Sequence, residues 1–262
     1  MILLPEQHYY KLKTHVLNVD YNNLFALAVI DRVVSGRVYV DNTEDPKTYY
    51  IVHRYGMSLL GGDHTNEEFN RTFFDYVINK DKSRTIVEWM QVYPVEWNEI
   101  LRRPELELNT RVNFVFDPGR YYEFRNSLKN DNSIRIERMS AGLFDKMNGT
   151  VTPKVFWNSF EDFNKNGVGF CLFYNNELAA TSFSSFLAPG KLELGIETVP
   201  GYRGRRLAER ICVALLDYCL ANNLEPLWAC RLENTGSYVL AKKLGFVVAR
   251  EMPYYRLDPG VL

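Results

Sequence analysis

A strand followed by a helix forms the most regular hydrophobic pattern of the chain. Over residues 191–199, leucine and isoleucine occupy alternate positions, while Glu193, a glycine and Glu197 lie between them. This period of two predicts a strand with one apolar face. After the turn signal at residues 200–201, apolar side chains recur every three or four positions over residues 207–221. That spacing predicts a helix that packs against the sheet.

The residues around this pair predict a mixed, twisted sheet flanked by helices, which is an α+β fold. Strands are expected at residues 133–137, 168–174, 178–186, 227–232, 246–249 and 252–257, the last of them at the edge of the sheet. Helices are expected at residues 141–147, 153–164 and 234–245.

The first half of the chain predicts a separate, smaller α/β domain over residues 1–125, joined to the second domain, residues 131–262, by a polar stretch at residues 121–131. Helices are expected at residues 22–35, 67–79 and 95–102, and strands at residues 37–40, 49–53, 86–90 and 111–116. This order of helices and strands loosely repeats that of the second half. The first domain can therefore be interpreted either as a degenerate duplicate of the second or as an unrelated accessory domain. No catalytic motif is visible in this half.

Composition and charge narrow the classes of partner. The chain has 262 residues, 24% of them charged, and a net charge of −1. This balance offers no basic field for nucleic acid or an anionic membrane. No signal peptide and no apolar run of membrane-spanning length are visible. We therefore expect a cytoplasmic protein, and the sequence is compatible with an oligomer.

Cysteine and histidine spacing predicts no metal site. Cys171, Cys212, Cys219 and Cys230 lack a C-x-x-C pairing and lie in apolar patterns, so buried thiols are expected. His64 follows an aspartate, but no second group at a metal-ligand spacing accompanies it.

The start of the helix at residue 207 has an unusual charge. Arg203, Arg205 and Arg206 lie beside the positive end of the helix dipole, and no Ser, Thr, Asp or Asn caps the first amides. A bound phosphate would accept those amide hydrogens and pair with the arginines. The alternative is a solvated basic turn whose helix is capped by water.

These residues resemble a known motif. Residues 203–208, Arg-Gly-Arg-Arg-Leu-Ala, are similar to the Arg/Gln-x-x-Gly-x-Gly/Ala signature of the GNAT superfamily of N-acetyltransferases. Arg206 stands where the family usually has its inner glycine, which allows unusual φ values. We expect Arg206 instead to keep an ordinary helical φ and to bind phosphate through its side chain.

A second motif lies at residues 234–246, where Asn234, Ser237, Gly245 and Phe246 are similar to the GNAT pattern Asn-x-x-Ser/Ala followed by Gly-Phe. Asn234 is also a plausible helix cap, and Gly245 suits the left-handed position after the helix. The resemblance covers residues 134–257. It implies that acetyl-CoA is the co-substrate, that no metal is needed, and that Asn234 contacts the pantetheine arm.

The resemblance also implies where the cofactor and the base lie. The cofactor would be bound by Thr198, Val199, Arg203, Gly204, Arg205, Arg206, Leu207, Ala208 and Asn234. A backbone amide near residues 197–199 would polarise the thioester. Glu193 and Glu197 are candidate bases, since burial of a carboxylate raises its pKa, although an exposed or ion-paired role is equally open for either.

The chain faintly resembles the zwittermicin-resistance type of acetyltransferase, which implies a small-molecule primary amine as acceptor, an antibiotic among them. The rival interpretation is a non-catalytic acyl-CoA-binding or interaction module. Transfer from aminoacyl-tRNA is disfavoured by the neutral charge. The family's usual tyrosine acid falls at Ala241, and we expect Tyr238, one turn earlier, to pack against the sheet.

Overall fold

Two compact units make up the computed structural model, which describes residues 1–260. The first unit contains Met1–Arg111 and the segment from Glu251 onward, and the second contains Val112–Arg250. The division therefore falls earlier than residues 125–131, and the last segment of the chain lies in the first unit instead of the second.

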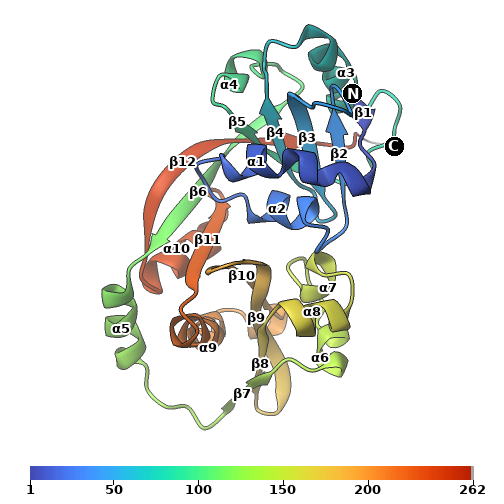
Figure 1. Ribbon diagram of the computed structural model, residues 1–262. Coiled ribbons are helices and arrows are strands. Elements are labelled where there is room, and N and C mark those ends of the chain that lie inside the picture. Colours follow the sequence, from blue (N-terminus) through green and yellow to red (C-terminus); the bar gives the residue numbers. More distant parts are fainter. Residues whose placement is uncertain (261–262) are drawn as a thin grey trace. The chain divides into compact units, whose positions relative to one another are not determined.

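The first unit is a sheet with helices (Figure 1). Its helices are η1 (Glu6–Leu12), α1 (Lys13–Leu17), α2 (Leu24–Ile30), α3 (Glu67–Val77) and α4 (Trp97–Ile100), and its strands are β1 (Ile2–Leu3), β2 (Gly36–Val40), β3 (Thr48–His53), β4 (Met57–Gly62) and β5 (Glu88–Tyr93). Neighbours from β1 to β4 are antiparallel, and β4 and β5 are parallel and joined through α3. The strands expected at residues 37–40 and 49–53 are confirmed as β2 and β3, which pair with each other, whereas η1, α1 and β4 were not predicted.

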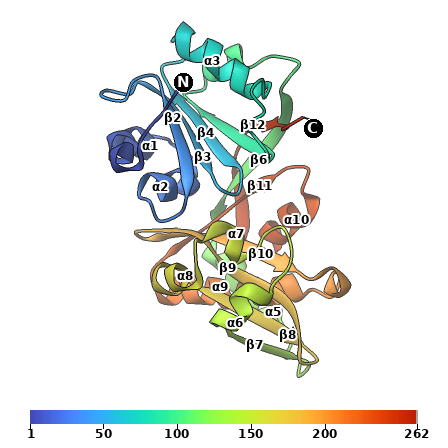
Figure 2. The same cartoon turned by 90° about the vertical axis from the view of Figure 1, so that its right-hand side faces the viewer.

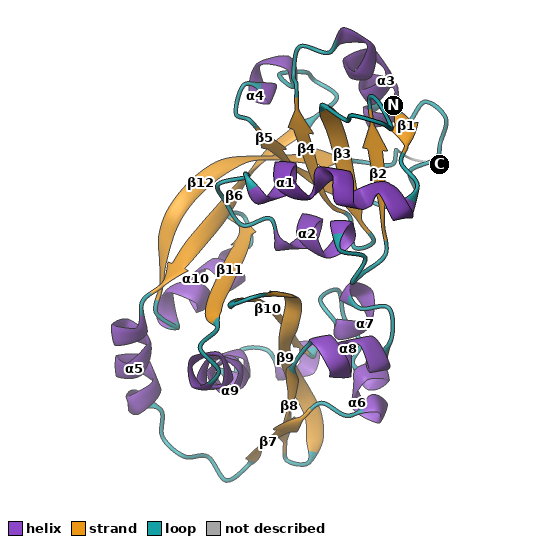
Figure 3. Ribbon diagram, viewed as in Figure 1, coloured by secondary structure: helices purple, strands orange, loops and turns teal. Residues whose placement is uncertain are grey.

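The second unit is also a mixed sheet with helices (Figure 3). Its helices are α5 (Pro118–Ser127), α6 (Ala141–Lys146), α7 (Pro153–Phe156), α8 (Phe160–Asn166), η2 (Pro200–Tyr202), α9 (Leu207–Ala221) and α10 (Thr235–Lys243), and its strands are β7 (Ile134–Arg138), β8 (Gly169–Tyr174), β9 (Glu177–Ala188), β10 (Lys191–Thr198) and β11 (Glu225–Arg231). Strands β7 to β10 pair antiparallel in chain order, and β10 and β11 are parallel. This confirms the α+β class.

Two long strands, β6 (Glu107–Phe116) and β12 (Phe246–Leu257), begin in one unit and end in the other. The last residues of β12 pair with β5, Tyr255 opposite Met90. Residues 252–257 therefore belong to the same strand as residues 246–249 and lie inside the first unit's sheet, between β5 and β6. The prediction that they form its edge is wrong.

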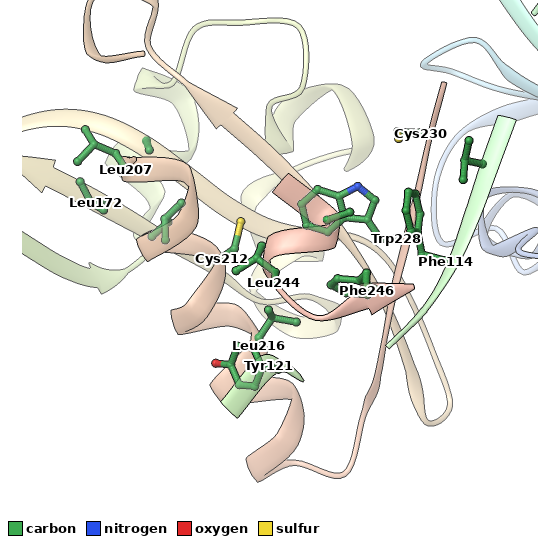
Figure 4. Packing of buried hydrophobic residues seen from close by; sticks show 14 of the residues in the cluster. Phe114, Tyr121, Leu172, Leu207, Cys212, Leu216, Trp228, Cys230, Leu244 and Phe246 are labelled. Atoms are coloured by element: carbon green, nitrogen blue, oxygen red, sulfur yellow. The ribbon is translucent and has the colours of Figure 1, made fainter. Parts of the chain in front are cut away.

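The core of the second unit lies between α9 and the sheet (Figure 4). The helix buries Leu207, Ile211, Cys212 and Leu216 against Trp228, Phe246 and other apolar side chains. Each fully buried leucine or isoleucine contributes roughly 1.5–3 kcal/mol, so this face fixes the helix on the strands. All four cysteines are buried, as predicted.

Helix α5 corrects the predicted polar junction. Asp117 accepts hydrogen bonds from the amides of Gly119 and Arg120, and Pro118 occupies the first turn, where its missing N–H costs nothing. The Tyr121 ring is fully buried, and its hydroxyl donates to Asp217 on α9 at 2.7 Å. The capping aspartate and this one aromatic anchor hold the polar segment as a helix.

Candidate functional site

The two parallel strands of the second unit separate after a short paired stretch. Strands β10 and β11 pair from Lys191 opposite Glu225 to Glu193 opposite Leu227, although β10 continues to Thr198 and β11 to Arg231. The diverging strands can be followed in Figure 2. Among residues 1–260, no strand therefore pairs with the edge of β10 that faces β11 beyond Glu193.

The two faces of β10 have different surroundings. Leu194 and Ile196 pack toward the core that α9 covers, as predicted. Glu193, Gly195 and Glu197 lie on the opposite face. A Cβ at Gly195 would lie 2.5 Å from the Phe183 ring on β9, so only glycine fits there.

One backbone amide of β10 is directed into the separated region. Val199 donates its N–H to the carbonyl of Ala179 on β9. Because successive residues of a strand direct their N–H groups to opposite sides, the Thr198 N–H is directed toward β11. Of the predicted residues 197–199, Thr198 therefore has the amide that a thioester entering between the strands could reach.

The backbone at Arg206 differs from the prediction. Arg206 has φ 61° and ψ 20°, the left-handed conformation, and precedes α9 without a side-chain cap on its first amides. The expectation of an ordinary helical φ is wrong: Arg206 has a backbone conformation that glycine adopts most easily. Left-handed conformation costs a non-glycine residue roughly 1–2 kcal/mol.

The three arginines have different partners. Arg203 donates from Nε to the carbonyl of Thr198 and from Nη2 to Glu197, both at 3.2 Å. Arg206 donates from Nε to Glu209 at 2.8 Å. The Arg205 guanidinium lies 5.5 Å from the centre of the Tyr174 ring.

A cavity of ≈ 320 Å³ opens at the start of α9. Six predicted cofactor residues line it: Thr198, Arg203, Gly204, Arg206, Leu207 and Ala208. Val199, Arg205 and Asn234 are not among its lining residues. The other residues that line it are Tyr202, Glu209, Gly236, Val239, Leu240 and Lys243.

Glu209 joins the two helices that line this cavity. Its side chain is 6% exposed, and it accepts from Arg206 on one oxygen and from Lys243 of α10 on the other, the latter at 2.9 Å. Glu209 is one of three charged residues that interrupt the apolar pattern of residues 207–221, and this interruption was the sequence signal for a buried partner.

The two candidate bases are both buried, Glu193 at 5% and Glu197 at 7% exposure. The Glu197 carboxylate accepts from Arg203 and from the backbone amides of Thr150 and Val151, each amide at 3.0 Å. The structure thus brings Glu197 into contact with Arg203, in the loop that precedes α9.

The second motif is a helix start. The Asn234 side chain caps α10 by accepting from the Ser237 amide at 3.2 Å, and the hydroxyl of Ser237 accepts from the Trp228 indole. Gly245 has φ +89°, as expected after a helix. The Tyr238 ring packs edge-on against Phe114, with centroids 5.6 Å apart, and Ala241 is fully buried. The expected packing role of Tyr238 is confirmed.

The first unit has the same order of elements, with α3 between the parallel strands β4 and β5. There the helix start is closed: Asn66 accepts from the Phe69 amide, and Glu67 and Glu68 occupy the first turn. The parallel strands also stay paired, from Met57 opposite Trp89 to Gly61 opposite Tyr93. This helix start would repel a phosphate, and the strands leave no opening.

A family model described as GNAT acetyltransferase matches residues 14–255. The chain belongs to this family. This GNAT protein is 25% identical over 260 residues to the uncharacterized N-acetyltransferase YdfB of Bacillus subtilis (strain 168), covering 96% of this chain and 97% of that protein.

Solved structures share the fold of this GNAT protein. A GCN5-related N-acetyltransferase-like protein from Streptococcus suis 89/1591 superposes with a TM-score of 0.72 at 15% identity, covering 97% of this chain and 100% of that one. A tandem GNAT protein from the clavulanic acid biosynthesis pathway gives 0.67 at 7% identity, with 100% and 98% covered.

Two further observations concern residues 1–260 of the GNAT protein. Their His, Cys, Asp and Glu side chains form no group of three that could hold a metal ion. None of their helices combines the length and apolar character needed to cross a membrane.

Proposed function

We propose that the protein transfers an acetyl group from acetyl-CoA to a primary amine of a small molecule. The observation that carries this proposal is the start of α9, where uncapped amides and basic side chains line a cavity beside two separated strands. Backbone amides without a side-chain cap and arginines are groups that bind a pyrophosphate, and β10 and β11 stop pairing after Glu193, beside this cavity.

We assign the cofactor to the second unit alone. Its helix start offers amides and positive charge, whereas the corresponding start of α3 has a cap and two glutamates. On this basis the first unit, residues 1–111 with the segment from residue 251, is a degenerate GNAT-like repeat. The predicted contact of Asn234 with the pantetheine arm stays a proposal, alongside its cap.

The reaction needs a polarised thioester carbonyl, a deprotonated amine and a departing thiolate. The Thr198 N–H supplies the hydrogen bond to the carbonyl. Glu193, buried on the same strand, is the proposed base, acting directly or through water. Because a thiol has an unperturbed pKa near 8.5, its thiolate leaves without the tyrosine that Ala241 replaces.

The acceptor is proposed to be a small molecule because the chain, with a net charge of −1, carries no strong basic field for a polyanion. We place the enzyme in the cytoplasm, where acetyl-CoA is available. An oligomer is compatible with this proposal.

Thioester consumption with a panel of primary amines tests the proposal. The expected result is acetyl-CoA-dependent release of free thiol with at least one amine, abolished when the amine is N-methylated to the quaternary form. Binding of acetyl-CoA without release of thiol for any amine would instead support a non-catalytic acyl-CoA-binding module.

A further inference from the structure

The side chain of Glu197 is surrounded by donors. Its Oε2 accepts from the amides of Thr150 and Val151 at 3.0 Å and from the Thr150 hydroxyl at 3.4 Å. Its Oε1 accepts from Arg203 Nη2 at 3.2 Å. A carboxylate oxygen has two lone pairs, so Oε2 has no lone pair left for an incoming ammonium.

The loop that donates these hydrogen bonds is built to approach the carboxylate closely. Gly149 has φ +153°, and a Cβ there would lie 2.5 Å from Glu197 Oε2. A side chain at this position would force the loop and the carboxylate apart. Close contact at Gly149 and two amides on one oxygen form a built anion-binding turn, which Glu197 occupies.

Arg203 connects this turn to the cofactor loop. It is the first residue of the motif at residues 203–208, and its guanidinium reaches back to Thr198 and Glu197. Its side chain is 63% exposed, and the residue lines the cavity at the start of α9. A chain of hydrogen bonds therefore runs from the cavity through Arg203 and Glu197 to residues 150–151.

We infer that Glu197 is a positioning residue that couples the cofactor loop to the segment at residues 149–151. This inference rests on the proposed function only in that acetyl-CoA is the ligand of the loop. A bound cofactor restrains Arg203, Arg203 restrains the carboxylate, and the carboxylate orders the backbone on the face of β10 that carries Glu193. Glu193 remains the base proposed above.

Hydrogen exchange at the amides of Thr150 and Val151 tests the coupling without knowledge of the acceptor. In the wild-type protein without ligand, both amides are expected to exchange slowly, and saturating acetyl-CoA is expected to slow them further. In Glu197→Ala both amides lose a charged acceptor, and exchange accelerates on the order of tenfold or more. Thr150→Val keeps the amide and removes only the weak hydroxyl contact, so it is the matched control with nearly wild-type protection.

Arg203→Ala separates the two halves of the inference. If Glu197→Ala does not fold, Glu197→Leu replaces it, because leucine has a similar size and no acceptor for the two amides. With Arg203→Ala, the amides keep their protection without ligand but lose the additional slowing by saturating acetyl-CoA. Unchanged protection in the folded Glu197 variant, or ligand-induced slowing that persists in Arg203→Ala, overturns the inference. If wild-type protein shows no thermal stabilisation by acetyl-CoA, the proposed function fails, while the ligand-free comparison still tests the contact itself.

Discussion

Replacing Arg206 tests the least expected feature of the cofactor loop, its left-handed backbone. Arg206 has φ 61°, a conformation that costs a residue with a Cβ roughly 1–2 kcal/mol and costs glycine almost nothing. Arg206→Ala keeps this strain and removes the ion pair with Glu209. Arg206 is 65% exposed and Glu209 is 6% exposed, and Glu209 keeps its ion pair with Lys243 in both variants.

Arg206→Gly removes the same ion pair but also the strain. Glycine also makes the unfolded chain more flexible than alanine does, which lowers the free energy of unfolding by roughly 0.4–1 kcal/mol and offsets part of this gain. The glycine variant is therefore expected to be more stable than the alanine variant by about 0.5–1 kcal/mol. Comparing the two variants with each other cancels the ion pair, so the difference isolates the backbone.

Urea unfolding of both variants measures this difference, and Ala214 on α9 provides the control. Ala214 lies inside the helix, where glycine is less favourable than alanine by about 1 kcal/mol. Ala214→Gly should thus destabilise the protein. At position 206 the order is expected to be reversed, with glycine more stable than alanine. If alanine at position 206 is as stable as glycine or more stable, Arg206 does not have a left-handed backbone and this account of the loop is wrong.

The remaining predictions concern the base, the cofactor loop, α10 and Tyr238. Glu193→Gln should lower turnover by roughly 10²–10⁴ and lose less at high pH, where the amine deprotonates unaided; wild-type rates across pH would show that the base lies elsewhere. Arg206→Glu should weaken acetyl-CoA binding strongly, as measured by calorimetry, because it adds an acid to the proposed pyrophosphate site, and unchanged affinity would place the phosphates elsewhere. Asn234→Ala should cost about 1 kcal/mol in urea unfolding through loss of the α10 cap, whereas no loss would mean that the cap contributes nothing. Tyr238→Phe should retain most activity, since its ring packs against Phe114, and a drop beyond about a hundredfold with intact cofactor binding would make Tyr238 the acid.

The sequence was sufficient to predict those elements that depend only on residues close together in the chain. The apolar alternation of residues 192–196, the stripe of α9, the cap at Asn234 and the glycine after α10 each depend on neighbouring residues, and the structure contains them as expected. Six of the nine expected cofactor residues line one cavity for the same reason, since a strand, turn and helix form it in chain order.

Features set by distant contacts were not predictable. Helix α5 has a weak apolar pattern and depends on the contact of Tyr121 with Asp217, which lies on α9. The partners of Glu197 come from residues 150–151, a segment with no hydrophobic period that would place it beside β10. Lys243 reaches Glu209 only because two helices meet.

The left-handed backbone of Arg206 shows a different limit. A left-handed backbone favours glycine, so the arginine at position 206 led us to predict an ordinary helical φ. The chain around it, with strand β10 ending at Thr198 and α9 beginning at Leu207, fixes the backbone instead. Local preference fails here because the strand and the helix are both held by the core.

Thermal unfolding with and without acetyl-CoA tests the central claim most directly, namely that the start of α9 binds the cofactor. At a concentration one hundred times the dissociation constant, acetyl-CoA and CoA should each stabilise the folded protein by about 2.7 kcal/mol, and Arg206→Glu should lose most of this stabilisation. Absence of any shift in the wild-type protein at millimolar acetyl-CoA would contradict the claim. An equal shift in Arg206→Glu would show that the ligand binds away from the cavity described here.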